Sequence, residues 1–208
     1  MDAFVVRPVN RAPLPEEAAR GDFYALLARL FYAAPDAPLL GALAGAQALP
    51  AKGDAALARA WRELAQASSA MDAEAAAEEY EGLFVGVGKA PVSIYAGYYT
   101  GAPAMDHPRV RIQAALAAFG LARPDGVTEP EDHFAALFEA MRVLVAGGAG
   151  RASATLAEQR HFFEEHLGRG AGKFFAAIDA AARANYYRKV AALGTAFISV
   201  EAESFLLD

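Results

Sequence analysis

Apolar side chains recur at helical spacing along most of this chain, and this pattern constrains the fold more than any other feature. The first apolar stripe, spaced i, i+3, i+4, i+7 and i+8, consists of Phe23, Leu26, Leu27, Leu30 and Phe31. Pro15 opens the predicted helix, with glutamates in the first turn where the helix dipole favours negative charge, and Pro35 ends it. Because no stretch alternates apolar and polar residues as a half-buried strand does, the chain is predicted to be all-α.

The remaining helices follow from the same kind of pattern. Short apolar stripes predict helices around Leu39–Leu43 and Ala55–Ala67, and Asp72 is a candidate N-cap for the next one. A helix from Pro108 is expected to end at Gly120, which suits a C-terminal cap, and two or three helices close the chain. The total prediction is eight or nine helices.

Length and composition indicate a globular protein and exclude several classes of function. With 208 residues, 55% of them hydrophobic, the chain is long enough for one large core, predicted for residues 15–208 after a flexible tail at residues 1–14. The net charge of −6 argues against nucleic-acid binding, and the absence of cysteine excludes disulfides and thiolate metal sites. No segment approaches the ~20 apolar residues of a membrane span, and no signal peptide is recognised. We therefore expect a cytoplasmic protein without stable membrane insertion.

The segment TEPEDHF, which begins at Thr128, carries the most suggestive polar residues of the chain. Thr128 and Glu131 match a capping box and Pro130 suits a first helical turn, so a helix is predicted to start here. Asp132 and His133 would then be consecutive helical residues, about 100° apart, and would not form a catalytic dyad. Two interpretations stay open. Either these residues only begin a helix, or the first turn lines a recognition surface with Asp132 available to a cation.

Residues 86–105 form the longest stretch without helical periodicity, and ordered loops of this length in compact domains are more often functional than idle. The aromatic residues in and just before this loop are Tyr80, Phe84, Tyr95, Tyr98 and Tyr99. Together with Pro91 and Ile94 they offer amphipathic contact area of the kind that recognises peptides. The alternative, a loop held in place by its own aromatic side chains, has equal weight.

Other signatures of catalysis or metal binding are weak. His161 and His166 are five residues apart, so they do not form the i, i+4 pair of a zinc-binding helix, and no metal site is predicted. The Gly86–Lys89 segment lacks the spacing of a phosphate-binding loop and follows a helix rather than a strand. Because serine-nucleophile motifs are also absent, no catalytic residue is assigned.

Two motifs occur in a fixed order along the chain. The first, YEGLFVGVGKAPVSIYAGYY, begins at Tyr80, and the second, EPEDH, begins at Glu129. They resemble the Y-x-x-L-F-x-G-x-G…P…Y-x-S-x-Y and E-P-D-D-H signatures of the TorD/DmsD/NarJ-like redox enzyme maturation chaperones, and the closing helices look similar as well. The chain departs from the family pattern at Ile94 and its neighbours, and at Gly170, where the family commonly has tryptophan.

The resemblance implies an all-helical, TorD-like cytoplasmic chaperone without catalytic activity. Such proteins bind the apo catalytic subunit of a molybdenum-cofactor oxidoreductase, commonly through its twin-arginine signal peptide, and hold it until the cofactor is inserted. The implied partners are that subunit and its signal peptide, with no nucleic acid and no cofactor bound by the chaperone itself. A monomer and a domain-swapped homodimer both stay open.

The partner-binding residues that the resemblance implies come from both motifs. They are Tyr80, Leu83, Phe84, Gly86, Pro91, Ile94, Tyr95, Tyr99, Glu129, Pro130, Asp132 and His133. In this hypothesis Asp132 and neighbouring acidic residues contact the arginine pair. Phe84, Ile94 and Tyr95 contact the apolar part of the peptide. His133 positions the loop.

Two further hypotheses stay open. One is a helical enzyme in which His133 acts as a general base with a carboxylate from another helix, which requires a closed pocket around that histidine. The other is a nucleotide-responsive binding protein, with weak guanine-nucleotide binding at the Gly86–Lys89 loop. Titration with GTP and ATP distinguishes this last hypothesis from the others.

Overall fold

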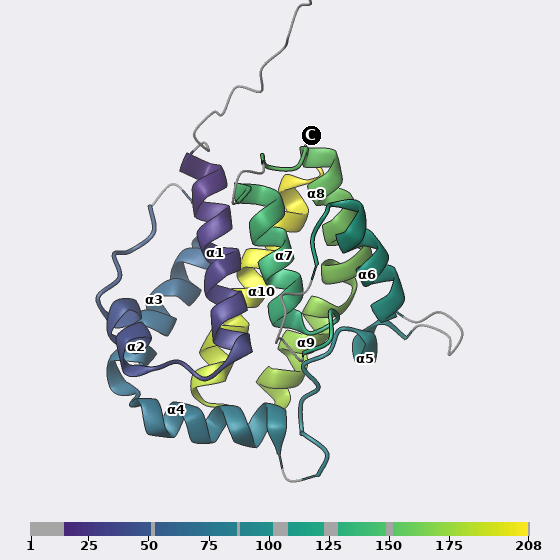
Figure 1. Ribbon diagram of the computed structural model, residues 1–208. Coiled ribbons are helices and arrows are strands. Elements are labelled where there is room, and N and C mark those ends of the chain that lie inside the picture. Colours follow the sequence, from purple (N-terminus) through teal and green to yellow (C-terminus); the bar gives the residue numbers. More distant parts are fainter. Residues whose placement is uncertain are drawn as a thin grey trace, which may run out of the picture.

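The computed structural model describes residues 15–50, 53–86, 88–101, 108–122, 129–148 and 152–207 (Figure 1). Within these residues the chain forms 9 helices and no strand, in one globular domain. This count treats helical segments that a π-helical turn joins as one helix. The all-α prediction of eight or nine helices is confirmed. The predicted tail at residues 1–14 lies outside the described part of the chain.

The central helix of the fold is α10 (Tyr186–Ser204), which lies between α3 (Ala55–Ala70) and α9 (Gly168–Ala180) and packs against both. In front of it in Figure 1, α1 (Pro15–Tyr32) and α7 (Phe134–Ala146) run side by side and form the most extensive helix pair. The apolar stripes of these helices face one another, and their buried side chains form a single core.

Shorter helices surround this group. Helix α2 (Ala37–Ala44) packs on α3, and α4 (Ala73–Tyr80) crosses the lower end of the molecule and continues into the π-helical turn η1 (Glu81–Val85) (Figure 1). Helix α5 (Gly97–Thr100) is a single turn that packs against α9, close to α6 (Pro108–Ala118).

Towards the end of the chain, α8 (Leu156–Phe162) continues through a second π-helical turn, η2 (Phe163–Leu167), directly into α9. A capping box at Thr155 and Glu158 starts this long helical segment. A π-helical turn inserts an extra residue into a helix and re-aims the side chains beyond it. Each π-helical turn places two neighbouring side chains in the core. They are Leu83 and Phe84 in η1, and His166 and Leu167 in η2.

Most predicted helix boundaries are confirmed. Helix α1 begins at Pro15, the Asp72 carboxylate caps α4 by accepting from the Ala75 N–H at 2.8 Å, and Gly120 follows α6 with φ of 63°. The prediction of a loop over residues 86–105 is wrong in one respect, because it contains α5. One turn of helix is too short to show an apolar repeat in the sequence.

The centre of the core is a group of aromatic rings around Phe31. Its ring centroid lies 4.9 Å from that of Phe174 and 6.0 Å from those of Phe84 and Phe138. Such pairs contribute about 0.5–1.5 kcal/mol each beyond the burial of their area. Phe84 belongs to the first sequence motif, so part of that motif is needed for the fold.

A buried carboxylate joins the C-terminal part of α10 to α1. Glu201 is 1% exposed and accepts hydrogen bonds from the Arg20 guanidinium at 2.7 and 2.9 Å and from the Tyr24 hydroxyl at 2.8 Å. Burial and the nearby Glu201 raise the pKa of Tyr24 well above its ordinary value, so it stays a donor. Because an unpaired buried charge is strongly destabilising, these bonds are what allow Glu201 to lie in the core.

Candidate functional site

The two sequence motifs meet in space although they are far apart in the chain. The Ala96 N–H donates to the Asp132 carbonyl at 2.8 Å, and the Phe134 N–H donates to the Ile94 carbonyl at 3.0 Å. Between these bonds, Tyr95 and His133 lie opposite each other in an antiparallel bridge. The loop after η1 and the turn before α7 therefore lie side by side, as the recognition hypothesis requires.

His133 is the N-cap of α7 and is 5% exposed. Its Nδ1 accepts from the Ala135 N–H at 3.1 Å, and its ring lies edge-on to Tyr95, with centroids 5.6 Å apart. Burial lowers the pKa of His133 to about 4, against the opposing effect of the Glu129 carboxylate. The imidazole is thus neutral at neutral pH, as its acceptor role requires. A general base would need a pKa nearer 7, so this geometry counts against the enzymatic hypothesis.

The predicted start of this helix is wrong. The capping-box pattern predicts a start near Thr128, a residue outside the described part of the chain, whereas α7 begins at Phe134. Before it, a turn is closed by the His133 N–H, which donates to the Pro130 carbonyl at 3.0 Å. The reason is tertiary, since pairing with the loop holds His133 in an extended conformation with ψ of 130° that no helical residue adopts.

Asp132 does not project freely into solvent as a helical position would predict. Its carboxylate is half-buried, and Oδ2 lies 3.0 Å from the position that a Cβ on residue 97 would occupy. Burial raises the pKa of Asp132, while hydrogen bonds from backbone N–H groups, including that of Gly97, and the charge of Arg109 act in the opposite direction. Asp132 therefore holds the first turn of α5, and only part of its carboxylate is left to meet a cation.

The neighbouring Glu131 is also engaged within the chain. Its Oε2 accepts from the Arg109 guanidinium of α6 at 3.0 Å, and its side chain is 11% exposed. Burial raises the pKa of Glu131, but hydrogen bonds from Gln113 and Arg109 outweigh this effect and lower it. This ion pair ties the turn to α6, so Glu131 contributes to the shape of the site more than to its outer surface.

Several residues that the resemblance assigns to the partner site lie beneath it, each under 9% exposed: Leu83, Phe84, Ile94 and Tyr99. The Phe84 ring packs 5.1 Å from that of Tyr187, and the Tyr99 hydroxyl donates to the Ser93 carbonyl at 2.8 Å. The expectation that Phe84 and Ile94 touch the apolar part of a peptide is corrected by these positions. Both side chains are turned into the core and support the loop from below.

The outer part of the site is an aromatic–acidic surface, which we define as the exposed Tyr32, Glu81 and Tyr95 together with the half-buried Glu129. Tyr32 and Tyr95 are 54% and 40% exposed. At its centre the Tyr80 hydroxyl donates to the carbonyls of Phe31 and Tyr32, both at 3.1 Å. Burial, followed by the nearness of Glu81, Glu129, Tyr95 and Tyr32, raises the pKa of Tyr80 to about 12. The surface lies at the C-terminal end of α1, where the helix dipole favours cations.

The loop that leads into this surface has a defined shape. Gly86 has φ of 63°, and a Cβ there would lie 3.2 Å from the Ala90 Cα, so glycine is needed at this position. Beyond it Pro91 is exposed, and the Lys89 ammonium lies over the Tyr98 ring, 5.9 Å from its centroid. This contact joins the two ends of the loop. Weak nucleotide binding at Gly86–Lys89 stays a prediction.

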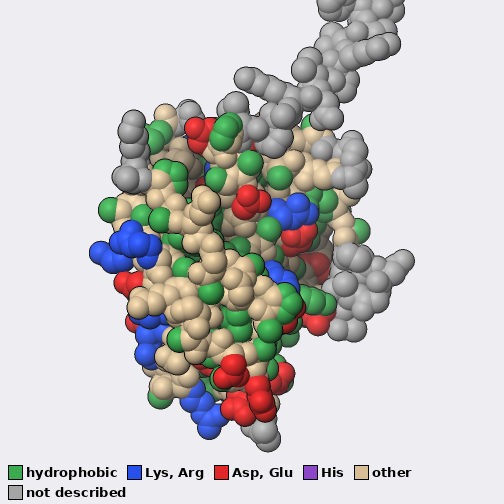
Figure 2. Space-filling view, turned by 90° about the vertical axis from the view of Figure 1, so that its left-hand side faces the viewer, with side chains coloured by type: hydrophobic (Ala, Val, Ile, Leu, Met, Phe, Trp, Pro, Cys, Tyr) green, Lys and Arg blue, Asp and Glu red, His purple; other side chains and the backbone are tan. Residues whose placement is uncertain are grey.

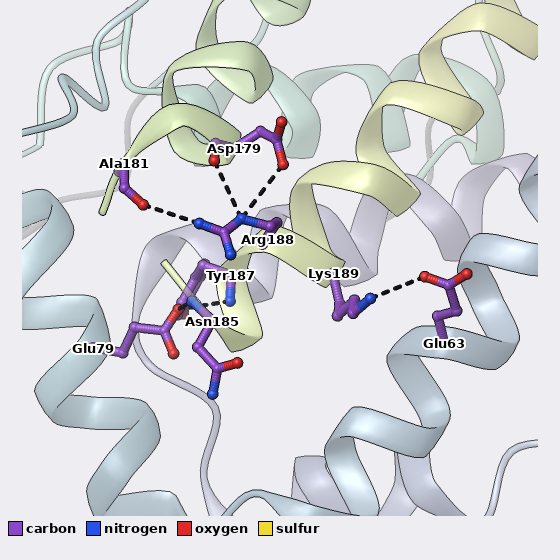
Figure 3. Close-up of polar contacts among 8 residues, drawn as sticks. All are labelled: Glu63, Glu79, Asp179, Ala181, Asn185, Tyr187, Arg188 and Lys189. Carbon is purple, nitrogen blue, oxygen red and sulfur yellow. Dashed lines mark hydrogen bonds and ion pairs between the residues drawn. The ribbon is translucent and has the colours of Figure 1, made fainter. Parts of the chain in front are cut away.

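Sequence reasoning missed Tyr32, Glu81 and a third residue, Glu79, which supports the site from α4. The Glu79 carboxylate accepts from the backbone N–H groups of Asn185 and Tyr187 at 2.8 Å, as Figure 3 shows, and from that of Tyr186 at 3.0 Å. It thereby caps α10 from another helix and fixes the start of the first motif against it. No local signal reveals this, because cap and helix are more than a hundred positions apart in the chain.

The surroundings of the site are acidic. Figure 2 shows acidic side chains gathered at the lower end of the molecule, over α4, where Glu74 and Glu78 are exposed. Within the described ranges, no group of three or more histidine, aspartate and glutamate side chains has the arrangement to hold a metal ion. Nor does any described helix have the length and apolar character needed to cross a membrane.

Comparison with known protein families gives a match to the family model described as nitrate reductase delta subunit, over residues 51–176. The matched region is more than half of the chain and contains both motifs and three of the four residues of the aromatic–acidic surface, with Tyr32 outside it. A comparison with curated protein sequences finds no match.

Proposed function

The chain belongs to the nitrate reductase delta subunit family, a family of molybdoenzyme maturation chaperones, and we propose that it binds the twin-arginine signal peptide of an apo catalytic subunit in the cytoplasm. In this role it covers the signal peptide and keeps the subunit available until its molybdenum cofactor has been inserted. It then releases the peptide for export or assembly. Binding has to be reversible, and no covalent chemistry is required.

The observation that carries the proposal is the pairing of the two motif segments, which sets the exposed Tyr95 and the Glu129 carboxylate near the Tyr80 hydroxyl at the C-terminal end of α1. A guanidinium group binds carboxylates through paired N–H donors and stacks on aromatic faces. The aromatic–acidic surface offers both kinds of contact, and the nearby helix end adds partial negative charge. An arginine pair is the matching ligand.

The apolar part of the signal peptide needs exposed rather than buried contacts. Three such side chains lie in and beside the same loop. They are Val85 at the end of η1, 52% exposed, Pro91 in the loop, and Tyr98 in α5, 64% exposed. In the proposed complex they take the place that the resemblance assigns to Phe84 and Ile94. The buried residues then act indirectly, by holding the loop in the shape that presents these groups.

The test is a calorimetric titration of the full chain with a synthetic signal peptide from its client, which co-purification from the native host identifies. Tyr95→Ala is expected to weaken binding ~10-fold, as for an aromatic contact at the centre of an interface. Glu81→Gln should weaken it about 3-fold, with less dependence on salt. Leu156→Ala, at an exposed apolar side chain of α8, is the matched control and should bind as the wild type does.

The outcomes separate the site from the function. If wild-type protein binds the peptide and both surface variants bind equally well, the aromatic–acidic surface is not the site. If the wild type binds no twin-arginine peptide and no arginine-containing variant of it, the proposed function is wrong. Replacing both peptide arginines by lysine is the control for charge alone, because lysine cannot form the paired contact with a carboxylate.

A further inference from the structure

A hollow lies away from both motifs. It is a groove of about 610 Å³ that follows α10 from Ala191 to Glu203, with α3 and α9 as its walls. The residues that form its surface come from one stripe of each helix, so its shape depends on regular helix packing rather than on a loop. Buried Phe175 closes the bottom, where its ring lies against the backbone of Gly194.

The dimensions of the groove suit an additional helix. Its small exposed side chains are Ala176, Ala192, Thr195 and Ser199, and at Gly172 a Cβ would meet nothing within 4 Å. Helices that meet through small residues approach to about 8 Å between axes. The stretch of α10 that lines the groove is roughly 18 Å long at 1.5 Å per residue, which corresponds to about three turns of a partner helix.

The two ends of the groove differ in charge. At the N-terminal end of α10, the Lys189 ammonium pairs with Glu63 at 3.1 Å and the Arg188 guanidinium pairs with Asp179 at 3.5 Å, as Figure 3 shows. Since Glu63 of α3 lies beside the start of α10, α3 runs antiparallel to α10. The opposite end is therefore lined by Asp54 and Glu203.

This second end attracts cations. The carboxylates of Asp54 and Glu203 supply its negative charge. Asp54 also caps α3 by accepting from the Leu57 N–H at 2.7 Å, and the partial charges of the antiparallel α3 and α10 ends oppose each other here. Arg59 of α3 lies between the two ends and is the cation that the lining contains, against four carboxylates. The groove is thus close to neutral at one end and negative at the other. This difference favours an occupant with a basic residue at one end and fixes the direction in which it lies.

We propose that the groove binds a helix from the body of the client catalytic subunit, separate from its signal peptide. This helix has a face of small or aliphatic residues and a lysine or arginine that lies over Asp54 and Glu203. The identity of the partner as the client rests on the proposed function. With this contact, the chaperone keeps hold of the folded part of the subunit while the signal peptide is released from the other surface.

The absence of cysteine makes a direct test available. Thr195→Cys provides a single attachment point for a fluorescent label in the groove, and Ala114→Cys provides a matched one on the exposed side of α6. Each labelled full chain is titrated with the purified cofactor-free catalytic subunit, once intact and once without its signal peptide. We expect iodide quenching of the label at position 195 to become roughly 5-fold slower with both forms, as burial at an interface predicts. The label at position 114 should not change.

Each alternative result contradicts the proposal in a distinguishable way. If the subunit binds while the label at position 195 stays open to iodide, the groove is not its contact, and the proposed function stands. If neither the subunit nor its signal peptide binds, the proposed function fails and the groove has no client to hold. If the label responds to the concentration of the chaperone alone, a second copy of this chain occupies the groove.

Blocking variants test the same contact without a label. Thr195→Trp fills the groove from an exposed position and should weaken binding of the subunit without its signal peptide by ~10-fold or more. Ala114→Trp is the control and should have no effect, and both variants should bind the isolated signal peptide normally. Glu203→Gln should weaken subunit binding about 2-fold at low salt and less at high salt. Normal binding of the subunit to Thr195→Trp would overturn the proposal.

Discussion

The aromatic–acidic surface and the groove along α10 are built in opposite ways. The first combines Tyr32 and Glu81, at helix ends, with Tyr95 and Glu129 from irregular backbone. The positions of the last two depend on the hydrogen bonds between Ile94 or Ala96 and the turn before α7. The second presents small side chains from regular helices. Large amphipathic rings beside carboxylates suit a charged peptide, whereas small residues between helices leave room for another helix. A surface that depends on paired loops should therefore be lost more easily than one made by helix packing.

The greatest loss of stability should come from a substitution in the core beneath the aromatic–acidic surface. Phe84→Ala removes a ring that packs against Phe31 and Tyr187, and should lower the free energy of unfolding by about 3–5 kcal/mol. Urea unfolding measures this loss. Thr195→Ala, in the groove, removes only exposed atoms and should change the free energy by less than about 0.5 kcal/mol. Equal losses for the two variants would contradict the comparison.

A smaller loss of stability is expected when Glu79, which caps α10 from α4, is replaced. Glu79→Ala leaves three backbone N–H groups of α10 without their acceptor and should lower the free energy of unfolding by about 2 kcal/mol. Glu79→Gln, which keeps one carbonyl oxygen, should lose less. Hydrogen exchange reads the site directly, because the amides of Asn185, Tyr186 and Tyr187 should exchange faster in Glu79→Ala. Unchanged exchange there would show that solvent replaces this cap at no cost.

The contact between Gly97 and Asp132 gives a still smaller effect that is specific to the aromatic–acidic surface. In Gly97→Ala the new Cβ meets the Asp132 carboxylate at 3.0 Å and should cost about 1 kcal/mol of folding free energy. In an Asp132→Ala background the same change should cost nearly nothing, because the opposing atom is gone. Thermal unfolding of the single and double variants measures this coupling. Strictly additive losses would mean that the two residues do not interact.

Stability should also depend on pH, through two different regions of the molecule. Burial lowers the folded-state pKa of His133 and of His166 to about 4, from 6.5. The unfolded chain therefore binds protons that the folded chain does not, so stability is complete above pH 6.5 and falls as the pH drops towards 4. Urea midpoints at pH 7 and pH 5 measure the change.

Variants assign this pH dependence to a region. His133→Gln should remove the part that belongs to the aromatic–acidic surface, where Glu129 faces the imidazole. His166→Gln should remove the part that belongs to η2, where Arg111 and Glu165 lie nearby. A signal-peptide affinity that falls with pH in the wild type but not in His133→Gln would connect the first part to binding. Identical pH profiles for all three proteins would rule out both histidines.

How much the sequence predicts depends on how local the cause is. The start of α1 at Pro15 and the cap of α4 at Asp72 were predictable, because each depends on residues within one turn. The start of α7 was not, since the pairing of His133 with Tyr95 overrides the capping signal. Similarly, Glu79 caps a helix far along the chain, and no nearby residue indicates it.

The same distinction applies to the candidate site. Both motifs were recognisable as a string of residues, and their meeting in space agrees with the recognition hypothesis. Their division into buried and exposed members was not recognisable. Phe84 and Ile94 have the chemical character of contact residues but support the core, while Tyr32, which ends α1, is exposed near Tyr80.

Local sequence alone decided that this chain is helical, that it has no thiol chemistry, and that it carries the two motifs of its family. Tertiary structure decided which side chains of those motifs face outward, where α7 begins, and that a groove remains along α10. The physical reason is that helical hydrogen bonds and caps connect residues within a few positions of each other. Burial and backbone pairing connect segments far apart, and their outcome depends on the packing of the whole chain.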